Sequence, residues 1–302
     1  MKKMYVNRAV VEGPYGGGNN FVKALYENAS EHGYIATNNL TSDIDAIFMI
    51  DPRYDEHGVS INEIASYKTA NPATKVFYRI NECDKRKGEN QVIDPVIKAS
   101  SKFCDVCFFI SDWIMDYHVD KGWQCSNNSV IYSGTNKQHF APRRKIDNGK
   151  INIVTHHWSD NRLKGQDVYE AIDDWISSRG DKYTFTYIGR TKSKFSNSKI
   201  VSPTFGQDLG NALSKFDVYV SGSRFDPGPN HIIESLACKI PTYAHKDSGG
   251  AVEMVGSDHV YNSVDHILDI LGSENFPSNN GLVPKDWSKC ISQYFEIINS
   301  VS

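Results

Sequence analysis

The sequence lacks the long apolar runs, the charge imbalance and the regular cysteine spacing that mark several protein classes. No stretch approaches the roughly 18 apolar residues that a membrane-spanning helix needs, and the apolar stretches near the N-terminus are too short for a secretory signal. The 33 basic and 36 acidic residues give a net charge of −3, which argues against a nucleic-acid binder with a broad basic surface. Six irregularly spaced cysteines in such a chain favour reduced thiols.

These absences lead us to expect a cytoplasmic protein with no transmembrane segment and no nucleic-acid partner. Peripheral contact with a membrane and the oligomeric state stay open. What is present is a chain of 302 residues, of which 39% are hydrophobic and 12% aromatic. That length and composition allow two domains, each with a sizeable core.

Short apolar runs alternate with amphipathic segments in two successive halves of the chain. In the first half the pattern predicts strands at 4–6, 46–50, 75–79 and 106–110 and helices at 20–31, 61–70, 93–101 and 112–121. In the second half it predicts strands at 151–155, 184–188, 218–221 and 241–244, helices at 166–177, 207–215 and 230–237, and a closing helix at 286–301. This alternation predicts an α/β fold with a doubly wound parallel sheet in each half. We place the domains at 1–140 and 141–284, followed by a C-terminal helix at 285–302.

The segment 221–256 carries the most chemical information. A strand there runs into the loop DPGPN and then into a short helix, whose first N–H groups can meet a phosphate or a sugar oxygen. Asp226 and Glu234 lie eight residues apart, so both carboxylates can accept hydrogen bonds from one polyhydroxylated ligand. Downstream, Ser248, Gly249 and Gly250 form a loop whose backbone N–H groups are unobstructed.

This order of loop carboxylate, seven residues, Glu, small-residue helix and Ser-Gly-Gly loop resembles the family 4 retaining glycosyltransferases of the GT-B fold. Asp226 stands where that family usually has Glu. The resemblance implies two Rossmann-like domains facing across a cleft, with the last helix packing back towards the N-terminal domain. It also implies transfer of a hexosyl group from a UDP- or GDP-linked sugar to a saccharide or other hydroxyl acceptor, as in polysaccharide biosynthesis. No cofactor or metal is expected beyond the nucleotide sugar itself.

The resemblance also assigns roles to individual residues. The N-terminal domain is expected to face the acceptor, and the C-terminal domain to bind the nucleotide sugar. Asp226, Lys164 and Glu234 are the candidate catalytic residues. The candidate donor-binding residues are Gly17, Gly18, Arg162, His157, Arg190, Phe205, Gly228, Pro229, Asn230 and His231. The candidate residues on the acceptor or sugar side are Arg79, Asn81, Glu82, Asp84, Ser248, Gly249 and Gly250.

Two further segments support or qualify these assignments. Lys164 precedes a helix in the loop after a predicted strand, where its charge can offset that of a leaving diphosphate. The arginine that the family has just after this strand is missing, so charge neutralisation falls to Arg162 or to a histidine of the His-His-Trp run at 156–158. The glycine-rich segment 12–25 lies between a strand and a helix, as in the family, but fits neither a dinucleotide fingerprint nor a Walker loop.

Two motifs with the appearance of metal sites are set aside. Cys104 and Cys107 lie three residues apart around a predicted strand, which turns their side chains to opposite faces. Asp43 and Asp45 precede a hydrophobic strand without supporting ligands. Two alternatives to transfer stay open at this point: a nucleotide-sugar epimerase on the same fold, and a non-catalytic protein that binds a sugar nucleotide.

Overall fold

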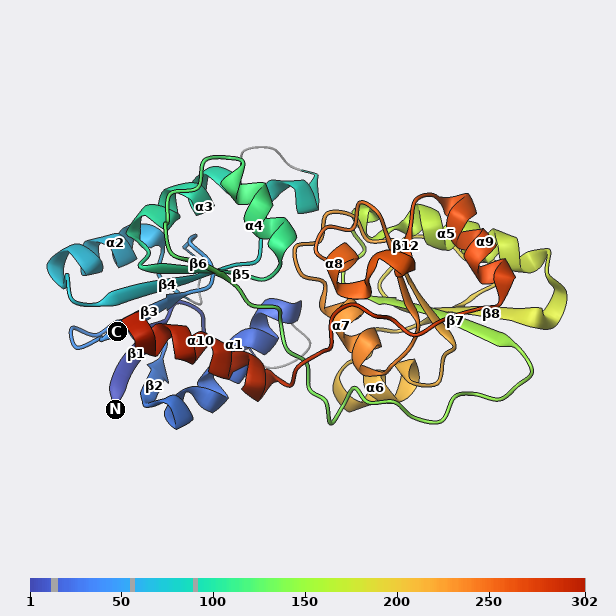
Figure 1. Ribbon diagram of the computed structural model, residues 1–302, viewed down its shortest axis with the longest axis horizontal. Helices are drawn as coiled ribbons and strands as arrows, with labels where there is room; N and C mark the ends of the chain where they lie inside the picture. Colours follow the sequence, from blue (N-terminus) through green and yellow to red (C-terminus); the bar gives the residue numbers. More distant parts are fainter. Residues whose placement is uncertain (12–15, 55–57, 89–91, 302) are drawn as a thin grey trace. The chain divides into compact units, whose positions relative to one another are not determined.

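The computed structural model describes residues 1–11, 16–54, 58–88 and 92–301, and it divides into two compact units (Figure 1). The first unit comprises Met1–Lys85, Glu89–Gly134 and Asp286–Ser302, and the second comprises Arg86–Gly88 and Thr135–Lys285. Each unit is built on one six-stranded sheet. All of the strand pairs described in both sheets are parallel.

The first sheet has the strand order β2-β1-β3-β4-β5-β6. Its strands are β1 Lys2–Val6, β2 Tyr34–Thr37, β3 Ala46–Met49, β4 Lys75–Ile80, β5 Val106–Phe109 and β6 Asn128–Val130. The helices of this unit are α1 Gly16–Asn28, α2 Ile61–Ala70, α3 Asp94–Ser100, α4 Asp112–Val119 and α10 Trp287–Val301, with the 3-10 helices η1 Ala29–His32, η2 Asp84–Lys87 and η3 Ser101–Phe103.

Alternating side chains of the first sheet feed two separate cores. Phe48, Phe77 and Phe108 pack on one face against α1 and α10, while Val76 and Tyr78 pack on the other face against α2, α3 and α4. Figure 1 shows the same two layers, with α1 and α10 on one side of the sheet and α2, α3 and α4 on the other. The period of two along each strand therefore decides which helices cover which face.

The second sheet has the order β12-β11-β10-β7-β8-β9. Its strands are β7 Ile151–His157, β8 Tyr183–Gly189, β9 Lys199–Val201, β10 Val218–Ser221, β11 Thr242–His245 and β12 Val260–Tyr261. The helices are α5 Gln166–Ser177, α6 Gly206–Leu213, α7 Asn230–Ala237, α8 Ala251–Val255 and α9 Val264–Ser273, with the 3-10 helices η4 Arg162–Lys164, η5 Gly180–Lys182 and η6 Ser257–His259. Figure 1 shows α5 and α9 on one side of this sheet and α6 and α7 on the other.

The strand order of the second sheet creates a topological switch point between β7 and β10. From β7 the chain continues to β8 on one side, and from β10 it continues to β11 on the opposite side. The two loops therefore diverge from neighbouring strands and leave a crevice at the carboxyl ends, where doubly wound sheets bind their ligands. The predicted α/β class with a doubly wound parallel sheet in each half is confirmed.

The predicted strands are all present, and the structure adds four short ones: β2, β6, β9 and β12. It also adds helix α9, for which no helix was predicted, and begins α1 at Gly16, four residues before the predicted start. The capping-box pattern Ser60-x-x-Glu63 is seen at the start of α2. Within the described part of the chain, no helix is both long and apolar enough to cross a membrane.

The packing of α10 yields a test of the first unit. Phe295 is fully buried and stacks on the ring of His32, with the ring centroids 4.6 Å apart. We expect Phe295→Ala to lower the free energy of unfolding by about 3 to 5 kcal/mol, because it removes a large core side chain and leaves a cavity. Urea denaturation measures this loss. Glu296→Ala, at an exposed position of the same helix, should stay within about 0.5 kcal/mol, and equal effects of the two variants would contradict the packing described.

Candidate active site

The candidate site is formed where the loops after β7 and β10 meet. Gly165 has a φ of +89°, and a Cβ there would lie 2.2 to 2.3 Å from backbone atoms of Gly222. Two hydrogen bonds also join the chain after β10 to the chain after β7. Arg224 N–H donates to the Leu163 carbonyl at 2.7 Å, and Gly222 N–H donates to the Tyr169 hydroxyl at 2.8 Å. Glycine at both contact positions is what allows the two backbones to approach this closely.

The Ser-Gly-Gly loop holds the backbone of Asp226. Asp226 N–H donates to the Ser248 carbonyl at 3.1 Å, and Gly250 N–H donates to the Asp226 carbonyl at 3.0 Å. The Ser248 hydroxyl donates to the Ser223 carbonyl at 2.6 Å. Gly249 has a φ of +73°, and a Cβ there would lie 2.6 Å from the Asp226 carbonyl oxygen. Ser248, Gly249 and Gly250 were expected on the sugar side of the site. In the structure they hold the backbone of Asp226, a candidate catalytic residue, in position.

Lys164 and Asp226 form a buried ion pair. The Lys164 Nζ lies 2.5 Å from Asp226 Oδ2, and only 16% and 9% of the two side chains are exposed. Burial raises the pKa of Asp226, but the adjacent Lys164 ammonium and a backbone hydrogen bond from Gly228 outweigh it, so the pKa lies below its ordinary value. Asp226 is therefore ionised at neutral pH. Two residues predicted from separate motifs are here in direct contact.

Glu234, the third candidate catalytic residue, contacts a histidine instead of a lysine. Its Oε2 lies 2.8 Å from Nε2 of His156, at the end of β7. The next residue, His157, shares a hydrogen bond of 2.6 Å with the hydroxyl of Tyr169 on α5. Consecutive histidines of the strand thus bond to different helices. His156 was not among the site residues predicted from the sequence, although a polar residue at the carboxyl end of a central strand is a usable signal.

His231 completes a group of three buried histidines. It is the second residue of α7, and its Nε2 lies 2.9 Å from the Ser221 hydroxyl oxygen. Its ring centroid is 4.7 Å from that of His157 and 6.1 Å from that of His156. Burial, together with the charge of Lys164, lowers the pKa of His231 well below its usual value. The pKa of His157 also lies well below its usual value, because of burial and of the neighbouring His231 and Lys164. Both rings are therefore neutral at physiological pH.

The remaining predicted residues of the DPGPN turn lead directly into α7. Pro229 occupies the N-cap position and Asn230 is the first helical residue, with no side-chain hydrogen bond at the cap. The first N–H groups of α7 thus keep their capacity to bind an anion, and the helix dipole adds to it.

Three predicted donor-binding residues lie at exposed positions of the second unit. Arg162 is exposed on η4. The Arg190 guanidinium lies over the ring of Trp158, 4.0 Å from its centroid. Phe205 is 58% exposed and precedes α6. Trp158, which is 39% exposed, was not among the predicted site residues, and it ends the His-His-Trp run at 156–158.

The predicted residues of the first unit lie at the carboxyl end of β4 and the start of α1. Gly17 and Gly18 fall in the first turn of α1, whereas residues 12–15 of the glycine-rich segment lie outside the described residues. A Cβ on Gly18 would lie 3.7 Å from the side-chain nitrogen of Asn81. The Glu82 carbonyl oxygen lies 3.1 Å from Nε2 of His118.

Two of these first-unit residues are committed to internal contacts. Arg79 is 2% exposed; its guanidinium lies over the Phe21 ring, 4.3 Å from the centroid, and donates to the Ser133 hydroxyl at 2.9 Å. The Asp84 carboxylate accepts hydrogen bonds from backbone N–H groups at the start of α3, including that of Ile93 at 2.7 Å. Asp84 therefore acts as a cap of α3 in this structure.

The described residues contain no group of three or more His, Cys, Asp or Glu side chains arranged to hold a metal ion. Of the two cysteines set aside above, Cys107 is buried and Cys104 partly so, and both thiols are free.

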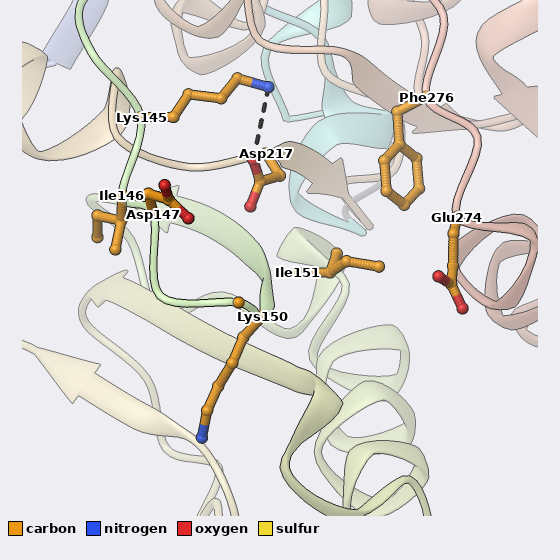
Figure 2. Close-up of a pocket in the computed structure, with 9 residues that line it drawn as sticks. Lys145, Ile146, Asp147, Lys150, Ile151, Asp217, Glu274 and Phe276 are labelled. Atoms are coloured by element: carbon orange, nitrogen blue, oxygen red, sulfur yellow. Dashed lines mark ion pairs between the residues drawn. The ribbon is translucent and has the colours of Figure 1, made fainter.

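A hollow also lies at the opposite, amino-terminal edge of the second sheet (Figure 2). It is lined by Lys145, Ile146, Asp147, Gly149, Lys150, Ile151, Asp217, Glu274 and Phe276. Figure 2 shows Lys145 paired with Asp217, at 3.5 Å. Lys150 forms an ion pair with Asp181, and Glu274 forms one with Lys182. Since ligands of doubly wound sheets bind at the carboxyl ends of the strands, this hollow is not the candidate active site.

Comparison with solved structures identifies the fold. Sucrose-phosphate synthase from Thermosynechococcus elongatus matches with a TM-score of 0.72 at 12% identity, covering 100% of this chain and 99% of that one. HepE from Anabaena, in complex with UDP and glucose, matches with a TM-score of 0.72 at 13% identity, covering 99% and 100%. A glycosyltransferase from Rickettsia africae ESF-5 gives 0.65 at 11% identity, covering 99% and 98%. No family model matches the sequence, and a search of the curated proteins gives no match. Identities this low show the fold alone, and they confirm the predicted GT-B fold.

The close approach of the two loops can be tested with a pair of glycine variants. Gly165→Ala should destabilise the protein by about 1 to 2 kcal/mol through its positive φ and by about 1 to 3 kcal/mol more through overlap with Gly222. Gly180→Ala is the matched control, because its φ is +60° but a Cβ there meets nothing within 4 Å. Chemical denaturation measures both. Equal losses would show that the contact with Gly222 does not constrain the loop.

Proposed function

We propose that the protein is a glycosyltransferase that moves a sugar from a UDP-linked donor to a hydroxyl acceptor. The single observation that carries the proposal is the Lys164–Asp226 pair at 2.5 Å, beside the start of α7 and at the switch point of the second sheet. A cation and the N–H groups of a helix start suit a diphosphate, and a neighbouring carboxylate suits sugar hydroxyls. UDP is favoured over GDP because structures of the similar protein HepE contain UDP and UDP-glucose.

The proposed chemistry is electrostatic. Lys164 and the first N–H groups of α7 stabilise the negative charge that develops on the departing diphosphate. Asp226 accepts hydrogen bonds from sugar hydroxyls, and Glu234 accepts them from the ribose hydroxyls of the nucleotide. The acceptor hydroxyl then attacks the oxocarbenium-like sugar on the face that the diphosphate leaves, and its proton passes to an oxygen of the departing diphosphate. Attack on that face retains the anomeric configuration. No protein nucleophile and no metal ion takes part in this scheme.

The two units have different roles in this proposal. The second unit binds the nucleotide sugar, because it contains Lys164, Asp226 and Glu234. The first unit supplies the acceptor side, through Asn81 and Glu82 at the carboxyl end of β4. The acceptor is a glycan or another hydroxyl compound, in keeping with the family 4 resemblance of the 221–256 segment.

The donor assignment predicts a selective thermal shift. UDP or a UDP-sugar, at a hundredfold excess over its dissociation constant, should raise the melting temperature by about 5 to 10 °C, whereas GDP and ADP should not. Glu234→Ala should abolish the shift, since it removes the acceptor for ribose hydroxyls. Glu296→Ala, on α10, should leave it unchanged. A folded protein that shows no shift with any nucleotide or sugar conjugate would contradict the assignment.

The role of the ion pair predicts a separation of stability from turnover. Lys164→Met should lower kcat by about 10² to 10³ and destabilise the protein by about 3 to 5 kcal/mol, because Asp226 stays buried and charged without a partner. Lys164→Met with Asp226→Asn should recover much of the stability but none of the turnover. Release of UDP from UDP-sugars across an acceptor panel measures kcat, and denaturation measures stability. Restored turnover in the double variant would show that the pair is only structural, and binding without turnover in the wild type would indicate a non-catalytic binding protein.

A further inference from the structure

The main chain of His156 is fixed at the end of β7 by one side chain of the neighbouring strand. The His156 N–H donates to the Tyr219 hydroxyl at 3.1 Å, and that hydroxyl donates to the His156 carbonyl at 3.3 Å. Tyr219 belongs to β10, which pairs with β7 in parallel. One hydroxyl thus bonds both main-chain polar groups of a residue that is 8% exposed.

The imidazole of His156 is held as firmly as its main chain. The Tyr219 ring lies edge-on to it, with the ring centroids 5.5 Å apart. The His231 ring on α7 is nearly perpendicular to it, with the centroids 6.1 Å apart, and His231 is itself bonded to the Ser221 hydroxyl at 2.9 Å. Between these rings, Nε2 of His156 is directed at Glu234 Oε2, 2.8 Å away. His156 is therefore a rigid group with one polar atom aimed at a carboxylate.

The Glu234 carboxylate is anchored at one oxygen and open at the other. Glu234 lies in the second turn of α7, and 14% of its side chain is exposed. Among the residues that the structure describes, His156 supplies the one hydrogen bond of this carboxylate, at Oε2. A glutamate side chain has three rotatable bonds, and ordering it costs conformational entropy. The contact with His156 orders the side chain and leaves Oε1 for a ligand.

The other two histidines of the group do not have a partner of this kind. His157 is bonded to the Tyr169 hydroxyl and His231 to the Ser221 hydroxyl, and Tyr169 and Ser221 are both fully buried. Their contacts connect parts of the interior. The contact of His156 ends instead at a side chain that a ligand can reach.

We propose that His156 is a positioning residue: its Nε2 fixes the Glu234 carboxylate in the orientation in which the open oxygen accepts hydrogen bonds from the ribose of the nucleotide. This inference rests on the proposed function, which assigns Glu234 to the ribose hydroxyls. A carboxylate that is ordered in advance loses little conformational freedom when the ligand binds, so the complex is tighter. Both the imidazolium and the neutral tautomer with hydrogen on Nε2 can donate this hydrogen bond.

A positioning role makes the effect of His156 depend on the ribose hydroxyls of the ligand. Loss of the Nε2 donor should weaken a nucleotide that has these hydroxyls and leave unchanged one that lacks them. A merely structural role would weaken both nucleotides equally. The matched pair of probes is UDP and 2′,3′-dideoxyUDP, because they differ only in the two hydroxyls.

The experiment is isothermal titration calorimetry with these two nucleotides. The wild type should bind UDP about 10- to 100-fold more tightly than 2′,3′-dideoxyUDP, since hydrogen bonds to a carboxylate are lost. His156→Leu should weaken UDP by about two- to tenfold and change 2′,3′-dideoxyUDP by less than about twofold. His156→Gln, whose amide can donate to Glu234, should restore the affinity for UDP. His266→Leu, on α9, is the matched control and should bind as the wild type does.

A double variant shows whether His156 acts through Glu234. Glu234→Ala should remove the preference for UDP, and its affinity is measured at UDP concentrations raised accordingly. Adding His156→Leu to Glu234→Ala should change that affinity by less than about twofold, because the group that His156 positions is already absent. Effects that multiply would overturn the inference. Equal weakening of both nucleotides by His156→Leu would overturn it as well, and so would a His156→Gln variant that binds UDP no better than His156→Leu.

The outcomes separate this inference from the proposed function. Failure of the folded wild type to bind UDP would contradict the UDP assignment and the inference with it. A wild type that binds UDP and 2′,3′-dideoxyUDP equally well would overturn the inference and leave the binding of UDP intact. Should His156→Leu not fold, His156→Asn takes its place, because its amide is one methylene shorter than that of Gln and falls short of Glu234. An affinity for UDP equal to that of His156→Gln would then overturn the inference.

Discussion

Strands β7 and β10 lie side by side in the second sheet, so the loops that follow them begin next to each other. The chain continues from these strands in opposite directions, so the crevice at their carboxyl ends follows from the strand order alone. Close contact in that crevice needs backbones without side chains, which Gly165 and Gly222 provide. The position of Lys164 and the course of the chain into α7 both depend on this close contact between Gly165 and Gly222.

The buried pair of Lys164 and Asp226 is better understood as preparation for a ligand than as a source of stability. Removing two charges from water costs free energy that their attraction only partly returns, and buried ion pairs are often no more stabilising than apolar residues of similar size. Here the backbone of Asp226 is fixed from two sides, by Ser248 and Gly250. A pair held this rigidly keeps its cation in place for an incoming anion, and that preorganisation is what electrostatic stabilisation of a leaving group requires.

The sequence predicted the central strands of both sheets and missed the edges. The four strands that it did not predict, β2, β6, β9 and β12, are the two outer strands of each sheet. They have two to four residues and are partly exposed. Central strands of parallel sheets are covered on both faces and appear as continuous apolar runs. Short edge strands need no such run, so their pairing depends on neighbours that a sequence pattern does not identify.

The sequence proposed candidate site residues, and the structure supplied their contacts. Motif spacing singled out Asp226, Glu234 and Lys164 as candidates, because each lies at a fixed offset from the end of a strand or the start of a helix. No spacing could show that Asp226 pairs with a lysine 62 positions away, or that Glu234 pairs with His156. Spacing also could not show the partners of Asp84. It was expected on the acceptor or sugar side, but its carboxylate accepts hydrogen bonds at the start of α3. The sequence indicates where a residue lies relative to the nearest strand or helix end. Which distant residue its side chain contacts is decided by the packing of the elements.

The two histidines at the end of β7 can be understood at the level of charge. A permanent cation after β7 would lie close to Lys164 and would raise the cost of burying both. Histidines at this point avoid that cost in the free protein, where burial and Lys164 keep His157 and His231 neutral. The site then holds the Lys164–Asp226 ion pair and, beside it, the 2.8 Å contact between His156 and Glu234.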